Sequence, residues 1–573
     1  MTSTPSAPST LSAQARAAAI RQLASGPEID VLVVGGGVTG AGAALEAVTR
    51  GLTTGLIDAR DYASGTSSRS SKLIHGGLRY LEMLDFRLVA EALQERGRLL
   101  TDIAPHLVRP VPFLFPFTRS WERFYIGSGV ALYDGMARIG GTDAGLPLQK
   151  QLTRRQALKL FPGLKPHSLT GALQYYDAQV DDARFVVELV RTAASFGALV
   201  ANRIEVTGFL RQGERVTGVK ARDRESGTEF DIKAKQVINA TGVWTDDTQR
   251  MLNERGTFKV RASKGVHIVV PKDRIHAKTG LILRTEKSVL FVIPWGRHWI
   301  VGTTDTEWEL DKAHPAATSA DIEYILEHVN SVLAVPLTPA DVEGVYAGLR
   351  PLLSGESDST SRLSREHIVA HTAPGLVVVA GGKYTTYRVM AKDAVDEAVN
   401  GLARKVPPST TQRLPLLGAQ GYRAIRNQRD QLAARSGLHP ARIEHLLARY
   451  GSSIRELLEL VEAEPELGLP LEGAEDYLRV EVAYAASHEG ARHLDDVLAR
   501  RTRISIEAWD RGVGAAPAAA AIMAPILRWS DEQARREVEL YRERVAAERA
   551  SQTLPDDESA DAARLAAREV TSG

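Results

Sequence analysis

The sequence predicts an α/β protein in which a parallel-sheet domain is interleaved with an antiparallel-sheet domain and followed by an α-helical domain. Three observations predict this. A glycine-rich turn joins a strand pattern to a helix pattern within residues 30–58, and short alternating segments over 200–305 indicate antiparallel strands. Beyond residue 411, leucine, alanine and arginine recur with helical periodicity to about residue 549. A period near 3.6 favours helix, and a period of two favours strand.

The composition narrows the class of protein. A chain of 573 residues is long enough for two to four domains, and 44% hydrophobic with 25% charged residues is ordinary for a soluble globular protein. The net charge of +1 argues against a nucleic-acid partner. There is no cysteine, which excludes disulfides and cysteine–metal sites and is compatible with a reducing cytosol.

The segment Asp30–Asp58 carries the strongest local signal. Val31–Val34 predicts a buried parallel strand, and Gly35, Gly37 and Gly40 form G-x-G-x-x-G before an alanine-rich helix. In such a turn the glycines permit the sharp bend, the approach of a pyrophosphate and close helix–strand packing. The helix N-terminus favours phosphate, and a carboxylate at Asp58 can accept a hydrogen bond from a ribose 2′-OH. We therefore expect a Rossmann-like domain that binds NAD or FAD. Its candidate residues here are Gly35, Gly37, Val38, Thr39, Gly40 and Asp58.

The next elements alternate between the two sheet domains. Thr66–Tyr80 is rich in hydroxyl residues and glycine, 86–100 predicts an amphipathic helix, and 111–164 is read as a covering region. Residues 182–196 predict a helix, and 200–240 predict a β-meander that ends in a small-residue turn at Gly242. This turn suits a second contact with the same dinucleotide.

Further strands are predicted at 264–271, 291–295 and 299–305, as parts of an antiparallel second domain. Leu376–Ala380 predicts another buried strand, and Gly381–Arg388 leads it into a helix for which Thr385 or Thr386 is the expected N-cap. This is a second strand–glycine–helix element, whose helix dipole favours negative charge. A proline-rich linker at 405–411 marks the start of the helical domain, and the polar end of the chain is expected to be disordered.

Together these motifs resemble the FAD-dependent glycerol-3-phosphate dehydrogenases of the respiratory, quinone-linked type. The resemblance covers roughly residues 30–400, and the helical region adds Asp495–Thr502 as its clearest signature. The segments Lys72–Tyr80 and Gly382–Arg388 are the most specific. The other shared motifs are Gly35–Gly42, Ala240–Gly242, Lys264–His267, Gly302–Asp305 and Gly348–Pro351.

The resemblance implies FAD as cofactor, with hydride transfer from C2 of sn-glycerol 3-phosphate to flavin N5 and electrons passed to a quinone. It implies further cofactor contacts from the hydroxyl-rich segment and from both later turns, namely Thr66, Ser67, Ser71, Lys72, Leu73, His75, Gly76, Gly77, Gly242, Trp244, Gly382, Lys383 and Thr385. The implied substrate-binding set is Arg79, Tyr80, His267, Arg350, Lys383 and Thr385. Arginine suits bidentate phosphate binding, and lysine suits a point-charge contact.

His267 and Arg350 are the candidate catalytic residues. His267 is the first candidate for the base because the unperturbed pKa of histidine lies near working pH, whereas Arg350 could stabilise a developing alkoxide. A single histidine on an alternating strand is more often structural, so the motif context carries this assignment. His367 and His371 have i, i+4 spacing, but they lie in a strand pattern and have no obvious carboxylate partner, so no metal site is expected.

The predicted domains are a tail and helix at 1–28, an oxidoreductase region at 29–404, a helical domain at 405–550 and a disordered tail at 551–573. Within 29–404, the cofactor-binding parts are 29–110, 165–260 and 345–404, and the substrate-covering parts are 111–164 and 261–344. The resemblance implies a cytoplasmic protein held peripherally at the inner face of the cell membrane, with a possible homodimer. An oxidase that uses O₂ and a non-catalytic flavin-binding protein remain alternatives.

Overall fold

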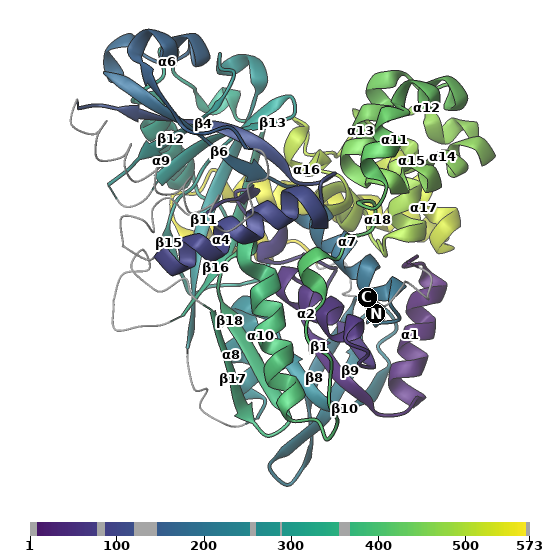
Figure 1. Cartoon of the computed structure of the whole chain (residues 1–573). Helices are drawn as coiled ribbons and strands as arrows, with labels where there is room; N and C mark the ends of the chain where they lie inside the picture. Colours follow the sequence, from purple (N-terminus) through teal and green to yellow (C-terminus); the bar gives the residue numbers. More distant parts are fainter. Residues whose placement is uncertain are drawn as a thin grey trace.

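The computed structural model describes residues 9–76, 86–119, 146–252, 259–286, 289–353 and 367–568. Figure 1 shows a parallel-sheet domain at the bottom of the view, a second sheet at the upper left and the C-terminal helices at the upper right. The chain passes between the two sheets several times, because strands of each sheet come from distant parts of the sequence. The predicted interleaved α/β architecture with a helical C-terminal domain is confirmed.

The first sheet is built around β1 (Ile29–Val34), in which every residue is buried. The strand order is β17-β18-β10-β1-β2-β7, and the strands from β18 to β7 run parallel. Helices α2 (Val38–Thr49), α7 (Asp182–Ser195) and α10 (Tyr387–Asn400) cover one face. Helix α1 (Ala13–Ser25) and the meander pack on the other. The other strands are β2 (Thr54–Ile57), β7 (Leu199–Ala201), β8 (Ile204–Gln212), β9 (Arg215–Asp223), β10 (Glu229–Asn239), β17 (His367–Ala373) and β18 (Leu376–Gly381).

The second sheet has the order β15-β11-β14-β13-β12-β4-β6-β3, with β16 also paired to β11 and β5 to β6. It is mixed rather than purely antiparallel as predicted, since β12 and β4 pair in parallel; these strands lie far apart in sequence and no hairpin joins them. The strands are β3 (Leu73–Ile74), β4 (Arg109–Phe117), β5 (Lys150–Thr153), β6 (Gly171–Gln179), β11 (Val260–Pro271), β12 (Gly280–Arg284), β13 (Val289–Trp295), β14 (His298–Gly302), β15 (Thr306–Trp308) and β16 (Gly344–Leu353). The helices of this part of the chain are α4 (Phe86–Arg98), α6 (Arg154–Leu160), α8 (Thr245–Arg250) and α9 (Ser319–Asn330).

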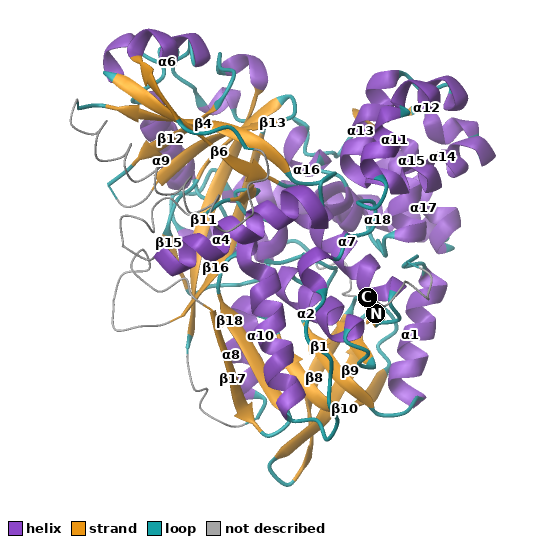
Figure 2. Ribbon diagram, in the orientation of Figure 1, coloured by secondary structure: helices purple, strands orange, loops and turns teal. Residues whose placement is uncertain are grey.

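The C-terminal domain is helical apart from the short hairpin β19 (Pro470–Leu471) and β20 (Ala474–Leu478), as Figure 2 shows. Its helices are α11 (Tyr422–Asn427), α12 (Arg429–Ser436), α13 (Pro440–Tyr450), α14 (Ile454–Ala463), α15 (Arg479–His488), α16 (Ile504–Glu507), α17 (Ala516–Leu527), α18 (Asp531–Ser551) and α19 (Asp557–Leu565). Within the described ranges, no helix is both long and apolar enough to cross a bilayer.

Helix α19 contradicts the predicted disordered tail over residues 551–568. Asp556 caps the helix by accepting a hydrogen bond from the Ser559 amide at 2.8 Å, and Ala560 is fully buried beside Trp308. A polar segment can form a stable helix when a neighbouring domain supplies a packing surface, because most helix stability in proteins comes from tertiary packing. One small apolar face and an N-cap are then sufficient for the helix to form.

Buried ion pairs join the C-terminal domain to the parallel-sheet domain. Arg500 and Arg501 both bind Asp61, with nitrogen–oxygen distances of 2.6 and 2.7 Å, and Arg203 binds Asp496 at 2.7 Å. These charges lie almost entirely out of water, so removing one partner would leave an uncompensated buried charge. The Asp495–Thr502 signature is therefore a docking element.

His493 adds a pH-dependent contact to this interface. Its Nε2 lies 2.9 Å from Glu225 and its Nδ1 lies 2.8 Å from Glu537, and these carboxylates raise its pKa to about 9 although burial opposes the charge. The pKa of His493 is higher in the folded state than its unfolded value of 6.5. Its ion pairs therefore contribute fully to the free energy of unfolding below pH 6.5, and this contribution is lost as pH rises through about 9.

We expect His493→Gln to lower the melting temperature at neutral pH, because both carboxylates lose a cationic partner. The difference in melting temperature between wild type and His493→Gln should shrink as pH rises from about 6 to about 10. Thermal unfolding of both proteins across this range tests the prediction. A difference that stays constant with pH would show that the imidazolium charge does not stabilise the interface.

Candidate active site

A cavity of about 890 Å³ lies where the two sheets meet. The N-terminus of α2 and the ends of β2, β10 and β18 line one part of it, and β11, β16 and the loop at 64–75 line the other. This volume is within the range of cofactor and substrate pockets. Sixteen of the sequence-predicted residues line it, namely Gly35, Gly37, Val38, Thr39, Asp58, Thr66, Ser67, Ser71, Leu73, His75, Gly242, Trp244, His267, Arg350, Gly382 and Lys383.

The glycine-rich turn has the geometry that its motif predicts. Gly35 has a φ of +110°, and Gly37 is the N-cap of α2 with its Cα facing the cavity wall near Ser67. A Cβ on Gly40 would lie 1.8 Å from the Gly35 carbonyl oxygen, so Gly40 serves packing and does not line the cavity. The N-terminus of α2 therefore faces the cavity, where it favours a phosphate-bearing ligand, although the Val38 amide itself donates to Ser67 Oγ at 3.0 Å.

Asp58 is held in place at the end of β2. Its carboxylate accepts hydrogen bonds from the backbone amides of Gly36 at 2.6 Å and Arg60 at 2.7 Å, while burial raises its pKa. Beside it, the Arg60 guanidinium lies 5.3 Å from the ring centroid of Trp244. Asp58 is thus oriented for a ligand hydroxyl, as the motif predicts for a ribose.

Arg350 comes from β16, opposite Ser263 of β11. Its guanidinium donates to Thr303 Oγ1 at 3.0 Å and the Thr304 carbonyl at 3.1 Å, and it lies 3.5 Å from Asp305. A Cβ on Gly265 would lie 2.5 Å from Arg350 Nη2, so a glycine on the adjacent strand leaves room for the guanidinium. The position of this guanidinium thus depends on three motifs that are far apart in the sequence, around residues 265, 303 and 350.

His267 lies in the same part of the cavity, with its Nε2 2.8 Å from Ser71 Oγ and its ring stacked on Tyr346 at 4.8 Å. Its Nδ1 is buried and has no hydrogen-bond partner among the described residues. Burial, and then the charges of Arg350 and Lys72, lower the pKa of His267 well below 6.5. The unperturbed pKa on which the sequence argument rests therefore does not apply at this position, because the sequence does not reveal the burial. The imidazole is neutral at physiological pH.

Four predicted residues do not line the cavity, namely Gly40, Lys72, Gly76 and Thr385. Lys72 is fully buried and its ammonium lies 2.8 Å from Asp182. Thr385 exchanges hydrogen bonds of 3.2 Å with the backbone of His75. Thr386 is the N-cap residue of α10, as one of the two predicted candidates, although its side chain makes no capping hydrogen bond. Gly77, Arg79 and Tyr80 lie outside the described residues, and their roles stay predictions.

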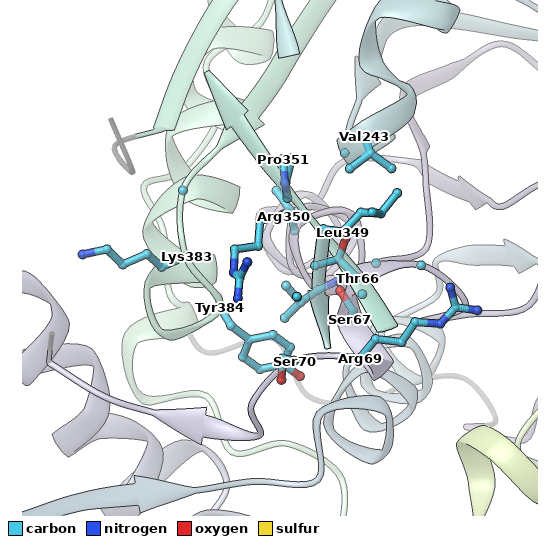
Figure 3. Close-up of a pocket in the computed structure, with 18 of the residues that line it drawn as sticks. Thr66, Ser67, Arg69, Ser70, Val243, Leu349, Arg350, Pro351, Lys383 and Tyr384 are labelled. Carbon is cyan, nitrogen blue, oxygen red and sulfur yellow. Dashed lines mark hydrogen bonds between the residues drawn. The ribbon is translucent and has the colours of Figure 1, made fainter. Parts of the chain in front are cut away.

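Lys383 lines the cavity beside Tyr384. Figure 3 shows the side chains of Lys383 and Arg69 extending to opposite sides, both away from Arg350. Arg69, Ser70 and Tyr384 also line the cavity and are not among the predicted site residues, although Arg69 and Ser70 lie in the Thr66–Tyr80 segment and Tyr384 lies in Gly382–Arg388. Phe291 and Arg284 also line the cavity, and no local pattern marks them, because only the pairing of β12 with β13 brings them there.

The two histidines of β17 have carboxylate partners that the sequence did not suggest. His367 Nε2 lies 2.9 Å from Asp393, and His371 Nε2 lies 3.2 Å from Glu397. Both acids belong to α10, so their helical spacing matches the spacing of the histidines along the strand. These are helix–sheet contacts, each with one histidine and one acid.

Comparison with known proteins decides the family. A family model described as FAD dependent oxidoreductase matches residues 30–395, and one described as C-terminal domain of alpha-glycerophosphate oxidase matches residues 409–534. The chain is 58% identical to glycerol-3-phosphate dehydrogenase 2 of Mycobacterium tuberculosis (strain ATCC 25618 / H37Rv) over 556 residues, which are 97% of this chain and 94% of that protein. The chain belongs to the FAD-dependent glycerol-3-phosphate dehydrogenase family.

More distant relatives share the same architecture. The human mitochondrial glycerol-3-phosphate dehydrogenase is 38% identical, with 92% of this chain and 74% of that protein covered. The crystal structure of the glycerol-3-phosphate dehydrogenase from Bacillus halodurans complexed with FAD superposes with a TM-score of 0.75 at 30% identity, covering 92% of this chain and 96% of that one. The chain is an enzyme of this family, and FAD is its cofactor.

The described residues fit FAD. Gly242 has a φ of +59°, and nothing within 4 Å blocks its Cβ direction, so it leaves the cavity open where β10 ends. The α2 N-terminus, Asp58 and the turn after β18 converge on the same space. We expect them to hold the pyrophosphate, the ribose and the flavin end of the cofactor, in that order.

Proposed function

We propose that this flavoenzyme oxidises sn-glycerol 3-phosphate at C2 to dihydroxyacetone phosphate. The observation that carries the proposal is the single cavity, which joins the glycine-rich N-terminus of α2 to the Arg350–His267 pair. A cation and a neutral imidazole next to a flavin site suit the oxidation of an alcohol that bears a phosphate. The names of the relatives point to the same substrate.

When bound, FAD supplies the hydride acceptor at N5, and the surrounding side chains bind and orient the substrate. Arg350 is our candidate for the phosphate or for the developing alkoxide, since its guanidinium is fixed by Thr303 and the Thr304 carbonyl. Lys383 is a second candidate cation of the cavity. Arg79 and Tyr80 complete the proposed phosphate pocket by resemblance.

His267 is the candidate acceptor of the C2 hydroxyl proton. Its lowered pKa keeps it neutral, so the ring can accept a proton at physiological pH. A bound dianionic substrate would oppose the effect of Arg350 and raise the basicity of the imidazole as the reaction begins. Ser71 and Tyr346 fix the ring against rotation.

His267→Gln is expected to lower kcat by about 100-fold or more while FAD content stays unchanged, because general base catalysis contributes roughly 10²- to 10⁴-fold. The test is the rate of flavin reduction by glycerol 3-phosphate in flavin-loaded protein. His328→Gln is the matched control, since His328 lies on α9 with its Nδ1 2.8 Å from the Tyr324 carbonyl, away from the cavity. A His267→Gln rate within threefold of wild type would exclude His267 as the base.

We propose a quinone as the electron acceptor and peripheral attachment to the inner face of the cytoplasmic membrane. Support comes from relatives named dehydrogenases and from the C-terminal domain, where Trp509 is half exposed and Arg549 of α18 donates to its carbonyl. Aromatic and cationic side chains suit an interfacial surface. A homodimer stays a prediction.

Steady-state turnover with glycerol 3-phosphate tests this function, with a quinone analogue and O₂ compared as acceptors. We expect rapid turnover with the quinone and slow turnover with O₂. Faster turnover with O₂, together with failure to sediment with anionic vesicles at low ionic strength, would favour an oxidase. No flavin reduction under either condition would favour a flavin-binding protein without this activity.

A further inference from the structure

The segment Ser68–Lys72 separates the cavity from a buried cluster of charges. Ser70 and Ser71 line the cavity, whereas the Lys72 side chain turns away and is fully buried. Lys72 has a φ of +58°, a left-handed conformation that is uncommon for a residue with a side chain. Such a backbone persists only where its surroundings hold it.

Asp182, the first residue of α7, binds both neighbours of Ser71 in the sequence, Ser70 and Lys72. Its Oδ2 accepts hydrogen bonds from the Ser70 amide at 3.0 Å and the Ser70 hydroxyl at 2.7 Å. Its Oδ1 accepts one from the Lys72 ammonium at 2.8 Å, and the Lys72 amide donates to Ser70 Oγ at 2.9 Å. One buried carboxylate therefore fixes the residues before and after Ser71.

Ser71 connects this fixed segment to His267. Its hydroxyl is the hydrogen-bond partner of His267 Nε2 at 2.8 Å, and the ring stacks on Tyr346, whose hydroxyl donates to the Ser70 carbonyl at 3.0 Å. The segment and the imidazole thus form one hydrogen-bonded unit. A shift of the segment would move Ser71, which makes the only side-chain hydrogen bond to the ring within the described part of the chain.

Arg503 brings the C-terminal domain into this unit. It follows the Asp495–Thr502 signature, and it is only 2% exposed. Its guanidinium donates to the Asp182 carboxylate, to Asp181 Oδ1 at 2.9 Å and to the Ser68 carbonyl at 3.3 Å. Its own amide donates to Tyr477 Oη at 3.1 Å, which anchors it within the helical domain.

We propose that Arg503 is a positioning residue for His267, acting through Asp182 and the Ser70–Lys72 segment. It does not line the cavity, so its effect on the reaction passes through Ser71. Lys72 contacts Asp182 and Arg449 contacts Asp181, whereas Arg503 binds both carboxylates and the Ser68 carbonyl, so it fixes Asp182 relative to the Ser68–Lys72 segment. The helical domain thereby contributes to the catalytic geometry of the other domains. The inference rests on the proposed role of His267.

The test compares flavin-loaded Arg503→Gln with wild type. We expect kcat for glycerol 3-phosphate to fall by about 10- to 100-fold, because small misplacements of a reacting group have effects of this size. KM should change by less than about threefold, since Arg503 does not touch the substrate. Arg503→Lys should recover part of kcat by restoring the positive charge without the planar fork.

Arg191→Gln is the matched control for domain docking. Arg191 is a fully buried arginine of α7 that binds Tyr484 Oη at 2.6 Å and Glu456 at 3.2 Å across the same interface, but it has no contact with Ser68–Lys72. The Arg191→Gln variant should have a lower melting temperature than wild type and an unchanged kcat. Ser70→Ala is the second test variant, for the case in which Arg503→Gln does not fold. It removes two hydrogen bonds without leaving a charge unpaired, and it should also lower kcat.

Crystal structures of the flavin-loaded variants give a readout that does not depend on the substrate. We expect the distance between Ser71 Oγ and His267 Nε2 to exceed 3.5 Å, or the ring to adopt several orientations, in Arg503→Gln or Ser70→Ala and not in Arg191→Gln. An unchanged 2.8 Å contact together with wild-type kcat overturns the proposal. If the wild type is not reduced by glycerol 3-phosphate, the proposed function fails, and the crystallographic distance still decides whether Arg503 positions the ring.

Discussion

Gly37→Val is expected to give a folded protein that is purified without flavin. Gly37 is the N-cap of α2 and lines the cavity, where a Cβ would already lie 3.2 Å from Ser67 Oγ. Two further methyl groups would occupy the space in which the pyrophosphate approaches the helix N-terminus. The extended backbone of Gly37, with a φ of −77°, accepts a side chain, so the fold should survive.

Absorbance spectra after reconstitution with FAD measure this effect. Wild type should show flavin bands and Gly37→Val should show none, with similar circular dichroism. Gly208→Val is the control, since Gly208 lies on β8, where the nearest atom to its Cβ direction is 3.8 Å away and belongs to the Lys220 side chain. A yellow Gly37→Val protein with normal FAD content would place the pyrophosphate elsewhere.

Arg350→Ala is expected to lower kcat/KM for glycerol 3-phosphate by about 100-fold or more while FAD stays bound. A charge-assisted hydrogen bond contributes about 1.5–3 kcal/mol, and about 1.4 kcal/mol is tenfold, so losing a bidentate contact removes at least two decades. The guanidinium is fixed by Thr303 and Thr304 before substrate binds, so little of this free energy is lost in ordering the side chain.

Arg261→Ala is the matched control for removing an arginine from this sheet. Arg261 precedes Ser263 on β11 and pairs with Glu307 outside the cavity. Steady-state kinetics of both variants, with flavin content measured in parallel, separate a substrate contact from a general change in charge. If Arg350→Ala retains wild-type kcat/KM, the phosphate or alkoxide is bound by other residues.

Much of the parallel-sheet domain could be predicted because its signals are local. The run Val31–Val34, the glycines after it and the acid at Asp58 lie within one βαβ unit, whose geometry follows from short-range sterics and hydrogen bonding. The turn after β18 could be recognised on the same grounds. The signals for these elements are independent of the strand pairing in the second sheet.

The environment of His267 could not be predicted, because strand pairing and the C-terminal domain determine it. Its low pKa results from burial beside Arg350 and Lys72, which lie 83 positions downstream and 195 positions upstream in the chain. The resemblance places Lys72 among the cofactor contacts, but its side chain binds Asp182, which also binds Arg503, in a buried charge cluster. Helix α19 was missed for a related reason, since its buried face is small and the neighbouring domain provides its packing surface.

One cavity is proposed to hold FAD and to select glycerol 3-phosphate through local cations. Overall charge cannot select a dianion, because the net charge is only +1. The most direct measurement is the absorbance of the flavin after anaerobic mixing of the purified protein with glycerol 3-phosphate or with glycerol. We predict rapid loss of the oxidised flavin bands with glycerol 3-phosphate and very slow loss with glycerol, because phosphate binding orients C2. Equal rates with both compounds, or no reduction by glycerol 3-phosphate, would contradict the claim.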